Sequence, residues 1–142
     1  LEPIEYTAAE LAWAATIRES FGDDAPDQAQ SREVEDYAVL TGYGSTDVGD
    51  VSRAVPTVSV RAATWVPGTA AHSWQAVAAS GHSYGTKGTQ HAAKAMMLAA
   101  VELYTNPQLR EEAKAEFIAA RGEDYVYESL LGDRAPPLDY RR

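Results

Sequence analysis

The sequence contains no cysteine, and this absence removes several chemistries at once. Disulfide bonds, thiolate metal sites and cysteine nucleophiles are all excluded. Because reducing compartments hold few disulfides, we expect a cytoplasmic location, although many exported proteins also lack cysteine.

Basic residues are also few, since 12 Lys and Arg stand against 21 Asp and Glu and give a formal net charge of −9. An acidic surface repels phosphate backbones and anionic lipid headgroups, so we expect no nucleic-acid partner. The most apolar stretch, residues 92–104, carries Lys94 and Glu102. It is shorter than the ~20 residues that a membrane-spanning helix needs, so we expect no membrane partner either.

What the sequence does contain is a clear set of helix signals. Thr7 and Glu10 form a capping-box pattern, which predicts a helix over residues 8–20. Asn106 and the proline after it are typical of a helix start and predict a second helix over residues 107–121.

Between these helices the apolar pattern is unbalanced. Residues 89–104 carry apolar side chains on nearly every face of a predicted helix, which is typical of a buried helix. Strand signals are sparse: a short apolar run at 37–41, and a stretch at 56–65 in which valines first alternate with polar residues. A buried helix needs a sheet on at least one side, and two strands are too few to supply it. We therefore expect an α/β fold that is incomplete on its own, with other polypeptide covering the helix.

None of the three histidines lies in a spacing typical of a metal site; they are His72, His82 and His91. A zinc ion takes three or four protein ligands, so a self-contained site would need distant carboxylates as well. His72 follows a loop of small residues, where an imidazole either faces a cleft or caps a helix that begins at Ser73. The residues alone leave both interpretations open, whereas we expect His82 and His91 to be structural.

Asp47 lies in a stretch rich in Gly, Ser, Thr and Asp, residues 42–52, which we expect to form a loop. There Asp47 is either a turn or helix N-cap residue or an acceptor that orients a metal-binding histidine. Serine hydrolysis has no support, because no Gly-x-Ser-x-Gly motif is present.

Several short motifs follow one another over roughly residues 40–105 in an order and spacing that is specific when taken together. They are Gly44–Ser52 (GSTDVGDVS), Pro56-Thr57, Arg61-Ala62-Ala63-Thr64, Pro67-Gly68-Thr69, His72-Ser73-Trp74-Gln75, Lys87-Gly88 and Ala92-Ala93-Lys94. This series resembles the C-terminal part of the aminobenzoyl-glutamate utilization B-like amidohydrolases, which belong to the aminoacylase and carboxypeptidase G-like family of metallopeptidases.

The resemblance implies a place in a larger fold. The family has a zinc-peptidase-like catalytic domain interrupted by a lid or dimerization domain, and residues 1–142 would be the C-terminal segment of that catalytic domain. Residues 1–22 would be the helix of re-entry after the absent lid, and residues 37–131 a part made of strand, loop and helix. The chain would then be a piece of a longer protein, an expectation that its start at Leu1, without an initiator methionine, also favours.

The resemblance also implies an activity, the hydrolysis of the amide bond in N-acyl amino acids such as aminobenzoyl-glutamate. The cofactor would be divalent metal, zinc or manganese, with two ions in the intact enzyme. His72 would be the last metal ligand, Asp47 would support the ligand shell without touching the metal, and Gly68 and Thr69 would line the substrate pocket. One departure is Thr46, which stands where the family has a glutamate.

The expected partners are therefore an N-acyl amino acid substrate, the remainder of the same enzyme, and further subunits in a homo- or hetero-oligomer. The family's other metal ligands and its glutamate general base belong to upstream motifs that do not occur here, so we expect no catalytic residue in this chain and no activity from it alone. The alternative is a non-enzymatic binding or assembly module.

Overall fold

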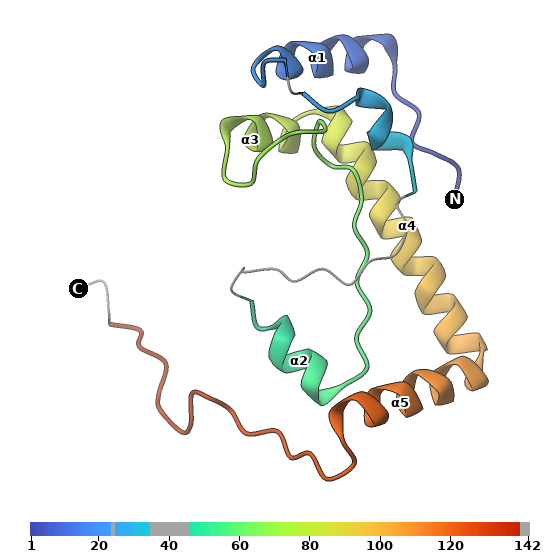
Figure 1. Ribbon diagram of the computed structural model, residues 1–142, viewed down its shortest axis with the longest axis vertical. Helices are drawn as coiled ribbons and strands as arrows, with labels where there is room; N and C mark the ends of the chain where they lie inside the picture. Colours follow the sequence, from blue (N-terminus) through green and yellow to red (C-terminus); the bar gives the residue numbers. More distant parts are fainter. Residues whose placement is uncertain (24, 35–45, 140–142) are drawn as a thin grey trace. The chain divides into compact units, whose positions relative to one another are not determined.

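The structure is a computed structural model in which the regular secondary structure of the described residues is helical (Figure 1). It describes the chain apart from residues 24, 35–45 and 140–142.

The chain divides into two compact units. The first consists of Leu1–Leu40 and Ser59–Thr105, and the second of Thr41–Val58 and Asn106–Arg142. The loop that carries His72 belongs to the first unit.

Helix α1, Ala8–Glu19, begins with the predicted capping box. The Thr7 hydroxyl accepts the backbone N–H of Glu10 at 3.2 Å, and the Glu10 carboxylate accepts the backbone N–H of Thr7 at 2.7 Å. Two backbone donors that have no partner inside the helix are thereby satisfied. Gly22 follows the helix with φ +74°, a conformation that glycine adopts without steric cost.

The core of the first unit is small and collects side chains from distant parts of the chain. Ala14 and Ile17 of α1 pack with Val66 and with Tyr84, which is fully buried. The short 3-10 helix η1 spans Gln28–Arg32. It is tied to this core because the Gln28 amide donates to the Tyr84 hydroxyl at 2.6 Å.

Helix α3, Trp74–Ser80, leads into helix α4, Ser83–Thr105, which starts well before the predicted residue 89. The earlier start of α4 was missed for a reason that is steric in the structure. A Cβ atom at Gly88 would overlap the carbonyl of Ala63, and one at Gly85 would overlap that of Ala79. The glycines weaken the helix signal in the sequence, but in the structure they allow backbone to pass closely against α4.

The expected α/β fold is wrong, because the described residues form helices and no strand. The predicted strand at 56–65 has no regular secondary structure, since a strand needs backbone partners and the described part of the chain provides none there. The predicted strand at 37–41 lies outside the described residues.

In the second unit the expected loop at 42–52 is partly a helix. Residues 41–45 lie outside the described residues, but α2 spans Val48–Ala54. Helix α5, Pro107–Arg121, begins and ends as predicted, because the Asn106 side chain accepts the backbone N–H of Leu109 at 3.1 Å and a positive-φ glycine follows Arg121. The guanidinium of Arg121 also donates to the carbonyl of Arg53 at 3.3 Å.

The expectation that other polypeptide covers α4 stays a prediction, because the helix is mostly exposed within the described chain. Its buried residues are all near its start, namely Tyr84, Gly85 and Gly88. Met97 is 68% exposed and Val101 58% exposed. Among the described helices, none is long and apolar enough to cross a membrane.

The close packing at Gly88 predicts a destabilised Gly88→Ala variant. The added methyl group would push against backbone that cannot rotate away, so we expect a loss of about 1–3 kcal/mol in the free energy of unfolding. Gly49→Ala is the control, because its Cβ would enter open space within α2 and alanine favours a helix by about 1 kcal/mol over glycine. Urea unfolding followed by circular dichroism measures both. Equal effects of the two substitutions would contradict the packing described here.

Candidate functional site

The loop before α3 has a defined shape that begins at a buried side chain. Val66 is only 1% exposed, and its carbonyl accepts both the backbone N–H of Thr69, at 3.1 Å, and the Thr69 hydroxyl, at 2.7 Å. Gly68 completes the turn with φ +94°, and a side chain there would meet Pro26 and Phe21. These contacts therefore hold in place the backbone from which the following residues extend.

His72 lies at the end of this loop in an unusual backbone conformation. Its φ of +61° is in the left-handed region, which few residues other than glycine adopt, and its side chain is exposed. The cap of α3 is Ser73, whose hydroxyl accepts the backbone N–H of Ala76 at 3.2 Å. The interpretation of His72 as a helix cap is therefore wrong, and its imidazole is available to a ligand or to another polypeptide.

Gly68 and Thr69 line a small pocket formed by residues 62–69, with a volume of about 230 Å³. Binding pockets for small organic ligands usually measure ~300–1,000 Å³, so this surface alone offers only part of such a site. Whether Gly68 and Thr69 bind substrate stays a prediction.

The described residues do not fit a metal ion by themselves. They contain no group of three or more His, Asp or Glu side chains that could hold one, whereas zinc takes at least three protein ligands. Any metal bound by His72 would need donors from outside these residues.

Asp47 belongs to the second unit, where it precedes α2. Its carbonyl accepts the backbone N–H groups of Asp50 and Val51, but its exposed carboxylate makes no cap hydrogen bond. Asp47 is therefore the N-cap residue of α2, as one interpretation expected, although it caps the helix through its backbone alone. Its pairing with His72 stays a prediction.

His82 has the structural role expected of it and lies in the turn between α3 and α4. Its ring stacks on Trp13 with centroids 4.0 Å apart, and its Nδ1 accepts the backbone N–H of Tyr84 at 3.1 Å. The ring thus links α1 to the first turn of α4.

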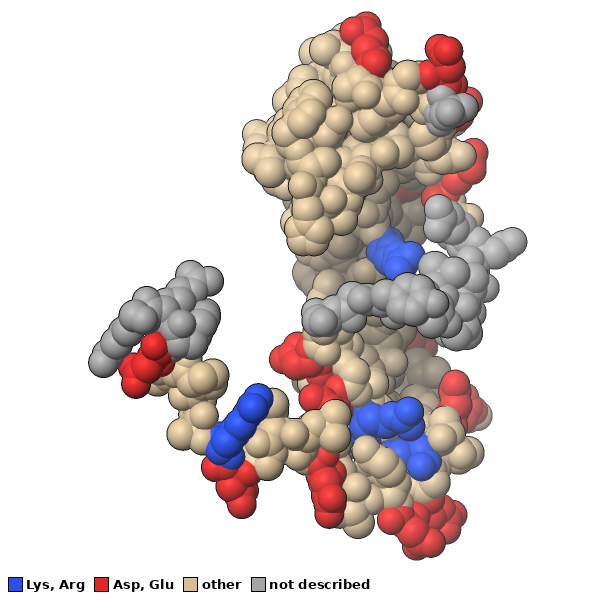
Figure 2. Space-filling model, turned by 60° about the vertical axis from the view of Figure 1, so that its left-hand side comes forward, with Lys and Arg blue, Asp and Glu red and all other residues tan. Residues whose placement is uncertain are grey.

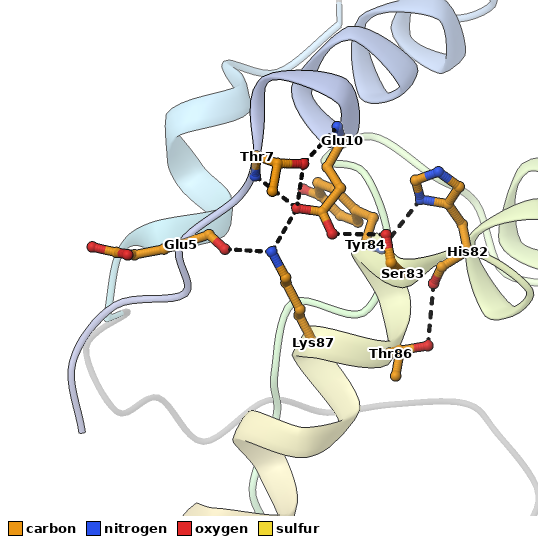
Figure 3. A network of polar contacts seen from close by, with 8 residues as sticks. All are labelled: Glu5, Thr7, Glu10, His82, Ser83, Tyr84, Thr86 and Lys87. Atoms are coloured by element: carbon orange, nitrogen blue, oxygen red, sulfur yellow. Dashed lines mark hydrogen bonds and ion pairs between the residues drawn. The ribbon is translucent and has the colours of Figure 1, made fainter.

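The sequence did not predict the buried carboxylate that joins these helices (Figure 3). Glu10 of α1 is 5% exposed, and its carboxylate lies between α1 and the first turns of α4. The ammonium group of Lys87 donates to Glu10 Oε2 at 2.6 Å and to the carbonyl of Glu5 at 2.8 Å. The hydroxyl of Ser83 donates to Glu10 Oε1 at 2.7 Å, so both carboxylate oxygens have partners.

These donors favour the ionised form of the carboxylate. The ammonium of Lys87 lowers the pKa of Glu10 most, and Ser83 and the backbone of Thr7 lower it further, from an ordinary value near 4.5 to about 2. An acid so strongly held in its charged form is a poor proton donor near neutral pH, so Glu10 is a structural anchor and not a general acid.

A weak signal for this contact does exist in the sequence. Ser83 and Lys87 are four residues apart, which places them on one face of a helix that includes both. That signal requires α4 to begin at Ser83, and the glycines in between obscured this start.

The comparisons with known proteins identify a distant relative. Over 88 residues, 61% of this chain, the sequence is 35% identical to a subunit of p-aminobenzoyl-glutamate hydrolase from Escherichia coli (strain K12). The matched part spans only 18% of the length of that protein. No protein-family profile matches the chain, and no solved structure matches it. The chain is therefore distantly related to a subunit of a hydrolase.

The Glu10 contact predicts a pH dependence of stability. Because folding lowers the pKa of Glu10, the stability it contributes is complete above about pH 4.5 and is lost as the pH falls toward about 2. We expect Glu10→Gln to lower the melting temperature at pH 7 and to flatten its decline over this acid range. Glu19→Gln, on the exposed end of α1, is the control and should behave as the wild type. If the melting temperature of Glu10→Gln fell with pH as steeply as that of the wild type, other groups would be responsible for the acid sensitivity.

Proposed function

We propose that this chain is a segment of a hydrolase of the p-aminobenzoyl-glutamate hydrolase type, and that it contributes His72 to a metal centre completed by polypeptide outside these residues. The observation that carries the proposal is the exposed, left-handed His72 at the end of a fixed loop, in a chain related to a hydrolase subunit.

The conformation of His72 supports a functional role. A residue other than glycine in the left-handed region costs of order 1–3 kcal/mol, and such residues occur often in active sites. Here helix capping does not explain the strain, because the cap of α3 is Ser73. An exposed imidazole held in one backbone conformation has little freedom to lose when it binds a metal ion or another group.

The metal dependence follows from the same residue. Imidazole is a common ligand of zinc, and it coordinates in its neutral form. Since the described residues contain no group of three or more donors that could hold a metal ion, the remaining ligands belong to other polypeptide in this proposal. Bound metal would supply Lewis-acid chemistry. The role of this chain would be to hold one ligand in place.

The substrate class in the proposal is an N-acyl amino acid, with p-aminobenzoyl-glutamate as its example. The turn at Gly68 and Thr69 would form one wall of the substrate site. The volume of about 230 Å³ fits this partial role, because a molecule of that size needs further walls.

An alternative is a non-enzymatic assembly module, and the exposed apolar side chains of α4 favour it for the isolated chain. The two functions differ in one respect. A module needs no exposed imidazole, so only the hydrolase predicts a chemical effect of removing it.

The test is the His72→Asn substitution in the complete hydrolase that contains this chain. Asparagine tolerates the left-handed backbone, so the substitution removes the imidazole without adding strain. Loss of a group that only supports a metal ligand costs ~10–100-fold, so loss of the ligand itself should lower hydrolysis of p-aminobenzoyl-glutamate by more than ~100-fold. Metal content, measured by mass spectrometry, should fall with it.

His91→Asn is the matched control, because it removes an imidazole from α4 and should keep both activity and metal. The isolated 142-residue chain should bind no stoichiometric zinc or manganese and should hydrolyse no p-aminobenzoyl-glutamate. Near-normal hydrolysis with full metal content in His72→Asn would refute the assignment of His72.

A further inference from the structure

A tryptophan is exposed close to His72. Trp74 is the first residue of α3 and is 60% exposed within the described chain, although tryptophan is on average a highly buried residue. The buried residues of α3 are Ala76 and Ala79, so this side of the helix packs on the core, and Trp74 and Val77 remain exposed. Two residues of chain span at most ~7 Å, so the Cα atom of Trp74 lies within that distance of the Cα atom of His72.

Hydrogen bonds hold the backbone on both sides of Trp74. The Ser73 hydroxyl, which caps α3, also donates to the carbonyl of Ala70 at 2.7 Å. The side-chain amide of Gln75 donates to the hydroxyl of Ser20, at the end of α1, at 3.1 Å. The start of α3 is therefore fixed. Because the indole side chain has only two rotatable bonds, Trp74 loses little entropy when it contacts a ligand.

The stretch of chain around His72 lacks charged side chains. Residues 62–86 contain no Asp, Glu, Lys or Arg, although these residue types make up 23% of the whole chain. In Figure 2 the side of the first unit that carries α3 is turned forward, and it is mostly free of charged side chains. Carboxylates bind most strongly to Arg and Lys, whereas an uncharged aromatic ring packs on apolar and aromatic side chains. This stretch therefore suits the acyl part of an N-acyl amino acid better than the amino-acid part.

The other two tryptophans offer less ring surface to a ligand. Trp13 stacks on His82, with ring centroids 4.0 Å apart. Trp65 contributes to the pocket formed by residues 62–69 and is 37% exposed. Trp74 is therefore the most exposed tryptophan of the chain and lies nearest to His72 along it.

We propose that Trp74 recognises an aromatic acyl group of the substrate by stacking its indole on the ring of that group. The inference deepens the proposed function and rests on it. In p-aminobenzoyl-glutamate the ring is bonded directly to the carbonyl carbon of the amide that is hydrolysed, so the ring would lie close to the metal ion that His72 is proposed to bind. The short distance along the chain from His72 to Trp74 fits this arrangement.

The test compares two substrates in the complete hydrolase that contains this chain. p-Aminobenzoyl-glutamate and N-acetyl-glutamate share the glutamate and the amide bond, but only the first has a ring in its acyl group. Trp74→Leu removes the indole and keeps an apolar side chain. Because stacked aromatic pairs contribute beyond the area that they bury, we expect kcat/KM for p-aminobenzoyl-glutamate to fall about 10-fold and that for N-acetyl-glutamate to change less than ~2-fold.

Two further variants control for effects on folding. Trp74→Phe keeps a ring and should retain most of the preference for p-aminobenzoyl-glutamate. Val77→Ala is the matched control, because Val77 is 74% exposed and lies one turn further along the same side of α3. It should leave both values of kcat/KM unchanged. An equal fall for both substrates in Trp74→Leu, or no fall for either, would overturn the inference, because Trp74 would then be structural or covered by other polypeptide.

Binding of both compounds, measured by calorimetry, separates this inference from the proposed function. If the wild type hydrolyses p-aminobenzoyl-glutamate and Trp74→Leu keeps the same preference for it, the function stands and the inference fails. If the wild type hydrolyses neither compound, the function is contradicted. In that case tighter binding of p-aminobenzoyl-glutamate than of N-acetyl-glutamate, lost in Trp74→Leu, would still support the inference, whereas equal or absent binding of the two compounds would overturn it.

Discussion

The carboxylate of Glu10 is the interaction on which the first unit depends most. It completes the capping box of α1, and it also receives the ammonium of Lys87 and the hydroxyl of Ser83 from α4. Burying a charge is costly unless it is paired and hydrogen-bonded, and here both carboxylate oxygens have partners. The same contact places Tyr84 in the core beside Val66, which is where the His72 loop begins. The geometry of the candidate site thus follows from a contact made by residues distant from it.

The interior that this contact organises is small for a chain of this length. The buried apolar side chains of the described residues are Ala14, Ile17, Val66, Ala76, Ala79 and Tyr84. Most of α4 and the stretch before the His72 loop remain exposed to water. A chain that buries so little apolar surface gains only a modest hydrophobic stabilisation.

The local signals in the sequence were reliable where neighbouring residues determine the structure. The capping box at Thr7 and the helix start at Asn106 are satisfied by contacts within four residues, and both were predicted. The start of α4 was not, because Gly85 and Gly88 lower helix propensity and are explained only by backbone that packs against them. The α/β fold failed for a related reason. Alternating valines indicate a strand, but a strand forms only beside a partner, and the described chain has none.

The candidate site shows the same division. The loop of small residues pointed to His72, and the structure adds that Ser73 caps α3 and that His72 has a positive φ. The Glu10 contact with Lys87 joins residues 77 positions apart. The spacing of Ser83 and Lys87 places these two on one helix face, but no local pattern identifies Glu10 as their partner. Asp47 retains its predicted role only as a hypothesis, because its partner would lie in the other unit.

Reconstitution of the hydrolase from two polypeptides tests the central claim most directly. The isolated chain would be mixed with the rest of the hydrolase lacking these residues, and hydrolysis of p-aminobenzoyl-glutamate would be followed over time. We predict that neither part is active alone, that the wild-type chain restores hydrolysis, and that a chain with His72→Asn restores none although it still associates. Equal restoration by both chains, or activity of the larger part alone, would contradict the claim that this chain supplies an essential ligand.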